Sequence, residues 1–138
     1  METSFEDFMA AWTDDPMHIK EACLRFRDTL AQPDITISFL ARPTISYSIR
    51  ASHPNARAQN RDYIALVDVI DDDTPATRWL SVCMYADMVT DPEEQGDFVP
   101  QGLGGEDALC FTLDEENPKQ CAYIAARLTE VVQAAKGA

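Results

Sequence analysis

The sequence predicts an α+β fold in which two N-terminal helices and one C-terminal helix pack on a five-stranded, mainly antiparallel sheet. Three observations support this class. Apolar residues recur at helical spacing near both ends of the chain, whereas the middle alternates or runs apolar as strands do. The strands are grouped, and the polar stretch 52–62 is too short for the crossover helix of a parallel sheet. At 138 residues, we expect one domain, 1–138.

The first two helices are predicted from their apolar faces and their starts. Ser4, with Asp7 three residues later, is typical of a helix N-cap. Asp15 before Pro16 predicts the start of the second helix, which must end before Pro33. The two apolar faces comprise Phe5, Phe8, Met9 and Trp12, and Ile19, Ala22, Cys23, Phe26 and Leu30.

Five segments have the pattern of strands, and the first two form a hairpin around Arg42-Pro43. The third is almost continuously apolar, which predicts a central strand buried on both faces. The strands are 35–41, 44–50, 63–70, 79–85 and 108–113. We expect one core cluster containing Phe39, Tyr47, Val67, Val82, Phe111, Ile124 and Leu128.

The long segment 86–107 has no strong periodicity, and Thr90 to Gly96 within it is typical of one capped helical turn. Gly102, Gly104 and Gly105 are expected to let the chain turn back into the sheet. Asn117-Pro118 then predicts the start of the last helix, whose apolar stripe runs to Ala135.

Several short stretches carry a further pattern, namely 38–39, 42–44, 46–48, Arg50, 69–73, 79–83, 91–94 and 104–107. Together they resemble a small, uncharacterised family of bacterial proteins of unknown function. The resemblance implies a fold and a bacterial cytoplasmic setting, and it transfers no catalytic residue.

Charge narrows the classes of partner. The chain has 24 acidic residues against 11 Lys and Arg, a formal charge of -13. This balance opposes binding to nucleic acid and to anionic membranes. The excess of acidic side chains keeps the chain in solution or, alternatively, favours a basic partner.

We expect a cytoplasmic protein, because the start lacks the pattern of a secretory signal and no apolar stretch is long enough for a membrane helix. All four cysteines fall at apolar positions, so we expect them to be reduced and buried.

The most distinctive polar surface lies on the first hairpin, where two guanidiniums stand among hydroxyl groups. They could hold a carboxylate or phosphate, or they could belong to an ordinary solvated sheet face. The candidate ligand-binding residues are Arg42, Ser46, Ser48, Arg50 and His53. In segment 86–107, the apolar residues predicted to contact a partner or a second copy are Met88, Phe98 and Leu103.

We therefore expect a noncatalytic domain that binds a partner protein or a small ligand, without cofactor or metal. No nucleophile and base stand in a recognisable catalytic motif. The alternative is an enzyme acting on a small anionic substrate held by Arg42 and Arg50, with His53 as acid or base. Whether the acidic residues of 86–107 bind a metal stays open, and consecutive Asp71, Asp72 and Asp73 indicate a solvated turn.

Overall fold

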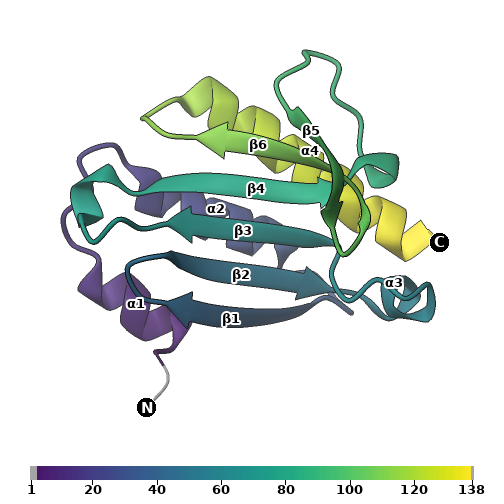
Figure 1. The fold of residues 1–138 in the computed structure, drawn as a ribbon, viewed down its shortest axis with the longest axis horizontal. Coiled ribbons are helices and arrows are strands. Elements are labelled where there is room, and N and C mark those ends of the chain that lie inside the picture. Colours follow the sequence, from purple (N-terminus) through teal and green to yellow (C-terminus); the bar gives the residue numbers. More distant parts are fainter. Residues whose placement is uncertain (1–2, 138) are drawn as a thin grey trace.

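A computed structural model of the chain describes residues 3–137. It contains four helices, two short 3-10 turns and six strands (Figure 1). In chain order they are α1 (Phe5–Ala11), α2 (Ile19–Leu30), β1 (Thr36–Arg42), β2 (Ser46–Ser52), α3 (Pro54–Ala58), β3 (Ala65–Ile70), η1 (Pro75–Thr77), β4 (Trp79–Tyr85), η2 (Ala86–Met88), β5 (Asp97–Leu103), β6 (Glu106–Leu113) and α4 (Pro118–Gly137).

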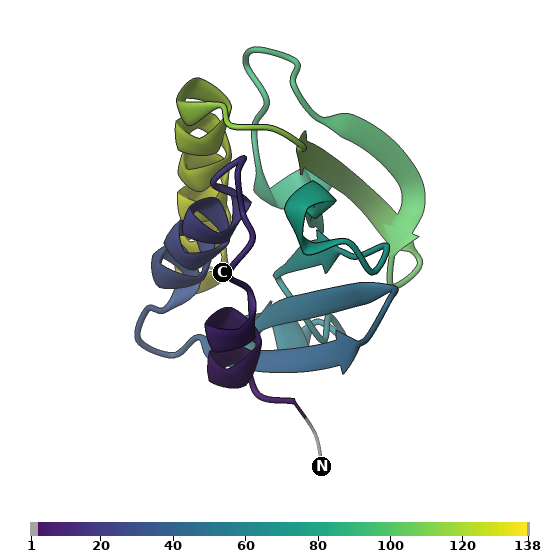
Figure 2. The ribbon, with the colours of Figure 1, turned by 90° about the vertical axis from the view of Figure 1, so that its left-hand side faces the viewer.

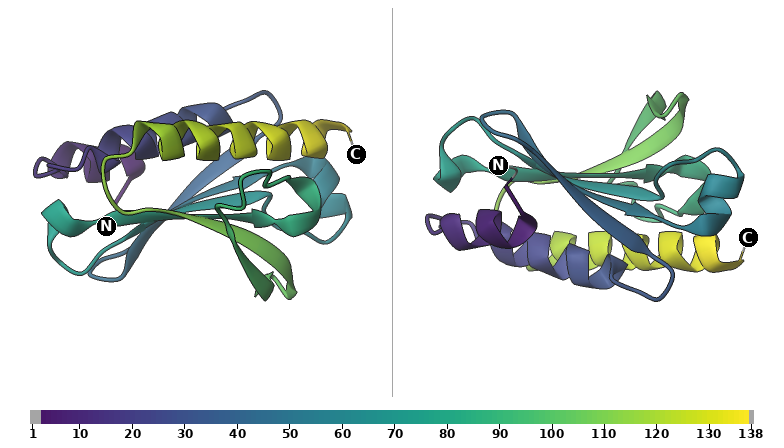
Figure 3. Two further views of the ribbon diagram at one scale, coloured as in Figure 1. Left: turned by 90° about the horizontal axis from the view of Figure 1, so that it is seen from above. Right: turned by 90° about the horizontal axis from the view of Figure 1, so that it is seen from below.

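The strands form one antiparallel sheet in the order β1-β2-β3-β4-β6-β5. The helices α1, α2 and α4 lie along one face of this sheet (Figure 2). No helix among residues 3–137 lies over the opposite face, which we call the uncovered face. The tip of the β5–β6 hairpin bends away from the helices (Figure 3). The predicted α+β class and antiparallel pairing are confirmed, but the prediction of five strands is wrong, because the sheet has six.

The additional strand, β5, lies inside the segment predicted to be irregular. Pro100 and Gly102 interrupt its apolar pattern, and its register with β6 shifts between Val99 and Leu103. An edge strand tolerates a proline because one side of its backbone has no partner. The expected turn after it is present, and Gly104 and Gly105 adopt φ values of 59° and 86° there.

The predicted helix starts are confirmed with one shift. The Ser4 hydroxyl accepts a hydrogen bond from the Asp7 N–H at 3.1 Å, and Asn117 caps α4 through the Gln120 N–H. The Asp15 carboxylate accepts the N–H groups of Ile19 and Lys20, both at 2.9 Å. Asp15 therefore caps α2 across a turn, from four residues before Ile19. It does not occupy the position immediately before the helix.

The predicted core lies between the sheet and the helices. Phe39, Ile49, Val67, Val82 and Phe111 stand in one cross-strand row on the helix-covered face. All seven predicted core residues belong to one cluster, with Phe39 and Tyr47 at its partly exposed margin.

The central strand β3 is not buried on both faces. Ala65, Val67 and Val69 are buried beneath the helices, whereas Leu66, Asp68 and Ile70 are half-buried on the uncovered face. Burial on one face only gives the alternation of an open antiparallel sheet. The nearly continuous apolar run is therefore explained by apolar residues on the uncovered face.

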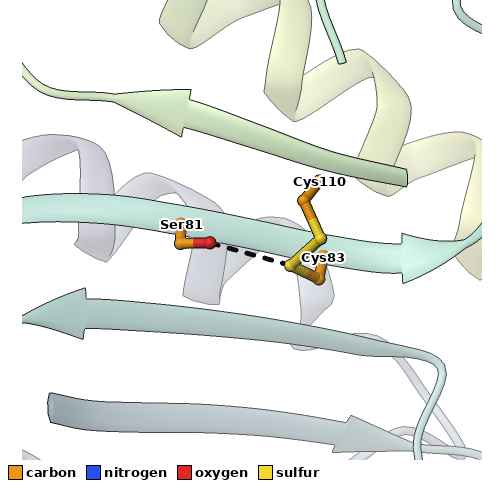
Figure 4. Close-up of a disulfide and its surroundings, with 3 residues drawn as sticks. All are labelled: Ser81, Cys83 and Cys110. Carbon is orange, nitrogen blue, oxygen red and sulfur yellow. Dashed lines mark hydrogen bonds between the residues drawn. A yellow bond between two sulfur atoms is a disulfide. The ribbon is translucent and has the colours of Figure 1, made fainter. Parts of the chain in front are cut away.

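The cysteines differ from the prediction. Cys83 and Cys110 form a disulfide between β4 and β6 (Figure 4), and both are half-buried on the uncovered face. The two strands place them directly opposite each other, with Cα atoms 4.1 Å apart. The bridge therefore follows from the register of β4 and β6. Of the free cysteines, Cys23 is buried, and Cys121 is only half-buried.

The cysteine environments predict selective labelling by an aqueous thiol reagent. Burial raises the pKa of Cys23 to about 12, so its thiol is both inaccessible and protonated at neutral pH. Without reductant, we expect rapid modification of Cys121 alone, measured by intact mass and peptide mapping. After mild reduction, Cys83 and Cys110 should also react. Modification of Cys83 or Cys110 in the folded protein without reductant would contradict this disulfide.

Candidate binding surface on the uncovered sheet face

The first hairpin places four of the five predicted ligand-binding residues on the uncovered face. The register pairs Arg42 on β1 with Ser46 on β2, and Ser38 on β1 with Arg50 on β2. Ser48 lies on β2 between Ser46 and Arg50. Arg42 is exposed, Ser46 and Arg50 are half-buried, and Ser48 is buried. The alternation of the hairpin predicted this arrangement, because residues two apart on a strand share a face.

The two guanidiniums on this face have no carboxylate partner among residues 3–137. Arg50 Nε donates to Ser48 Oγ at 3.2 Å, and its Nη1 donates to the Tyr63 hydroxyl at 3.5 Å. The guanidinium also stands 5.4 Å from the centroid of the Tyr63 ring. Arg50 is therefore held in place by neutral groups, which leaves its charge uncompensated by an ion pair.

Asp68 on β3 occupies the centre of the same face. It is directly opposite Ser48 and Ser81, in the row between those of Arg42 and Arg50. Burial raises the pKa of Asp68, and the Ser48 hydroxyl and the charges of Arg50 and Arg42 oppose that rise only in part. Its Oδ1 is inaccessible and has no hydrogen-bond partner among the described residues.

Apolar side chains surround these charges. Leu40 on β1 is 36% exposed, and Leu66, Ile70 and Trp79 are half-buried on β3 and β4. Ile45 lies in the β1–β2 turn and is 63% exposed. Apolar area therefore lies beside the unpaired arginines on this face.

The unsatisfied carboxylate predicts a pH-dependent effect of Asp68→Asn. Because the pKa of Asp68 is raised in the folded state, the folded protein binds this proton more tightly than the unfolded chain does. The aspartate therefore lowers stability as pH rises above its unfolded pKa, near 3.9. We expect Asp68→Asn to raise the unfolding temperature at pH 7 and to lose this advantage near pH 3. An exposed control, Asp62→Asn, should show no such pH dependence.

A decrease of the unfolding temperature at pH 7, or a gain that does not change with pH, would contradict this account of Asp68.

The fifth predicted residue, His53, is not part of this surface. It follows β2 as the N-cap of α3, it is buried, and its Nδ1 accepts the Asn55 N–H at 3.1 Å. That role occupies the nitrogen lone pair a general base would need. The sequence interpretation missed α3 and therefore placed His53 in an open loop.

The three residues predicted to contact a partner are also separated. Leu103 is buried in a small cluster with Tyr85 and Ala108, and Met88 is half-buried against both clusters. Only Phe98 is well exposed, at 58%. Arg61 fastens this region by pairing with Asp87 and Glu106, in each case at 2.8 Å.

The turn before β5 is fixed to α4 rather than free to move as a lid. The Asp91 carboxylate accepts the N–H groups of Gln95 and Gly96, and the Tyr123 hydroxyl donates to it. Arg127 on α4 also donates to the Thr90 carbonyl at 3.2 Å.

No group of three or more His, Cys, Asp or Glu side chains within residues 3–137 is arranged to hold a metal ion.

Asp71 is not in a solvated turn. It is buried, and its Oδ1 accepts from Arg78 Nε at 2.9 Å while its Oδ2 accepts the Thr44 N–H. The Arg78 guanidinium lies within 5.0 to 5.3 Å of the ring centroids of Phe8, Trp12 and Tyr47. This cluster ties α1 and the hairpin turn to the β3–β4 connection, and no sequence motif indicates it.

One hollow of about 460 Å³ is not over the hairpin. It lies beside α2 and the start of α4, where it is lined by His18, Arg25 and Cys121 among others. The nitrogens of His18 face Glu21 and Glu116, each at 3.1 Å. The polar residues of the hairpin and this hollow are therefore separate features.

The fold and this surface define a small α+β domain with helices on one sheet face and an amphipathic opposite face. Comparisons with protein-family models, curated proteins and solved structures each give no match. No helix within residues 3–137 is long and apolar enough to cross a membrane.

Proposed function

We propose that this chain is a noncatalytic binding domain and that it binds a partner protein through the uncovered sheet face around β1 and β2. The observation that carries this proposal is the coexistence, on one face, of the unpaired Arg42 and Arg50 with exposed apolar area at Leu40. Partner contact would compensate the charges and remove the apolar area from water.

The central carboxylate supports a functional role for this face. Asp68 retains a buried oxygen without a hydrogen bond, which lowers stability at neutral pH. Natural sequences tolerate such costs most often at functional sites.

The geometry gives less support to an enzyme acting on a small anion. The rows of Arg42 and Arg50 are four strand residues apart, or about 14 Å. Asp68 lies in the row between them, so a small anion bridging the guanidiniums would be next to a carboxylate. A longer ligand can contact both arginines without that repulsion.

Site-specific photo-crosslinking tests the proposal. A benzophenone amino acid at position 40 reports on the uncovered face, and the same amino acid at exposed position 126 on α4 is the matched control. In cells of the natural source, we expect a discrete protein adduct at position 40 only. Its yield should fall when Arg42→Gln and Arg50→Gln are added.

Equal adducts at both positions, or none at position 40, would contradict the proposal. Saturable shifts of the Arg42 and Arg50 guanidinium signals with millimolar inorganic phosphate would instead favour a small anionic ligand.

A further inference from the structure

The two edges of the sheet differ in how their backbone groups are protected. On β5, Pro100 lacks an N–H and the register shift after Val99 distorts the strand. Strand β1 has neither device, because its seven residues pair regularly with β2 and include no proline, lysine or acid. Sheets usually protect their edges against added strands. The outer edge of β1 therefore presents available donors and acceptors.

Strand β1 is also accessible through its side chains. None of its seven residues is buried, whereas each of the other five strands contains at least one buried residue. Within residues 3–137, only β2 pairs with it. An added strand would thus meet an edge that no described strand occupies.

The sequence around this edge has a charge opposite to that of the chain. No aspartate or glutamate occurs between Ile35 and Arg61, although the chain has 24 acidic residues. Arg42, Arg50 and Arg57 in this stretch form no ion pair with a described carboxylate, and Arg57 instead donates to Ser52 Oγ at 3.1 Å. The edge is therefore complementary to an acidic segment.

The helix-covered side of β1 borders a hollow of mixed polar and apolar lining. This hollow of about 350 Å³ lies between α1, the end of α2 and β1. Phe5, Ile37 and Phe39 provide apolar lining, Ser4, Glu6 and Arg27 provide polar lining, and the Arg27 guanidinium stands 4.6 Å from the Phe5 ring centroid. Side chains of an added strand would alternate between this hollow and the arginine-bearing face.

We propose that the outer edge of β1 receives an extended, acid-bearing segment of a partner protein as a seventh strand of the sheet, an inference that rests on the proposed function. Backbone pairing provides affinity in this mode, and alternate side chains provide specificity. Ser38 lies opposite Arg50, and Arg42 is four residues further along β1. The segment would therefore carry carboxylates four residues apart, with apolar residues between them on the other face.

Charge argues against a second copy as the occupant. Pairing two β1 edges would bring two acid-free, arginine-bearing stretches together. These like local charges oppose such an encounter at low salt, whereas the carboxylates of an acidic segment are attracted to the arginines of the edge.

The probe is an end-capped nine-residue peptide with threonine at its odd positions and valine at its even positions, except that glutamate replaces threonine at the third and seventh positions. We expect it to bind the full chain and to protect β1 amides from hydrogen exchange. Replacing both glutamates with glutamine should weaken binding by about 2- to 30-fold, the range for two exposed ion pairs. Binding should also weaken in 0.5 M salt.

Two controls separate strand addition from charge attraction alone. N-methylation of alternate peptide residues removes backbone donors and should abolish binding without changing peptide charge. The protein variant Arg42→Gln/Arg50→Gln should lose the preference for glutamate. A matched variant, Lys119→Gln/Lys136→Gln, removes the same charge from exposed sites on α4 and should retain it.

Unchanged binding of the N-methylated peptide, or protection confined to residues away from β1, would overturn the strand-addition proposal. So would concentration-dependent protection of β1 without peptide, which would identify a second copy as the occupant. The crosslink at position 40 is independent of strand addition. If it persists while the peptide fails, the binding function stands and this mode is wrong.

Discussion

Replacing Arg78 with alanine is expected to lower the free energy of unfolding by about 3–5 kcal/mol, the range for breaking a buried ion pair. The change leaves the buried Asp71 carboxylate without its guanidinium partner and removes contacts with three aromatic rings. Denaturant unfolding, followed by circular dichroism, measures the loss.

Two variants control for nonspecific effects of removing an arginine. Arg57→Ala removes an exposed guanidinium and should cost about 1 kcal/mol or less. The double replacement Arg78→Met/Asp71→Leu should recover much of the loss, because apolar residues can substitute for a buried pair. A cost below about 1 kcal/mol for Arg78→Ala would mean that the ion pair and its aromatic contacts contribute little.

Truncation of the core predicts a comparable effect. Phe111 and Leu128 are fully buried between β6 and α4. We expect Phe111→Ala or Leu128→Ala to lower the free energy of unfolding by about 2–5 kcal/mol, through lost burial and the cavity left behind. The same denaturant experiment measures both.

The exposed Phe98 supplies the matched control, and Phe98→Ala should cost less than about 1 kcal/mol. Losses below about 1 kcal/mol at both Phe111 and Leu128 would contradict the assignment of the helix-covered face.

The elements that the sequence predicts well are those with local signals. The side chains of Ser4 and Asn117 each accept a hydrogen bond from the N–H group three residues later in the chain, so local spacing identifies both caps. Alternation on the hairpin assigned Arg42 and Arg50 to one face without knowledge of the rest of the sheet.

The features that the sequence did not predict depend on long-range pairing. Asp71 and Arg78 are paired in a cluster completed by aromatic residues from α1 and β2. The bridge between Cys83 and Cys110 depends on the β4–β6 register, across a separation of 27 residues. Neither the turn composition nor the apolar positions of the cysteines contains that information.

Strand β5 was missed for a different reason. Its pairing partner is near in sequence, but Pro100 and Gly102 are typical of loops, and its residues are mostly exposed. Edge position relaxes the pattern that makes interior strands recognisable. The residue of the candidate surface that sequence reasoning missed, Asp68, lies in an apolar run, and only the absence of a covering helix shows that it belongs to this surface.

The Cys83–Cys110 bridge also closes a covalent ring that contains η2, the turn before β5, and β5 itself. Cleavage of one peptide bond after the exposed Glu93 or Glu94 would open the backbone without releasing either fragment. The nicked molecule would migrate as one species until a reductant is added. Oxidised protein could thus retain both halves of its sheet after a proteolytic cut that would let reduced protein separate.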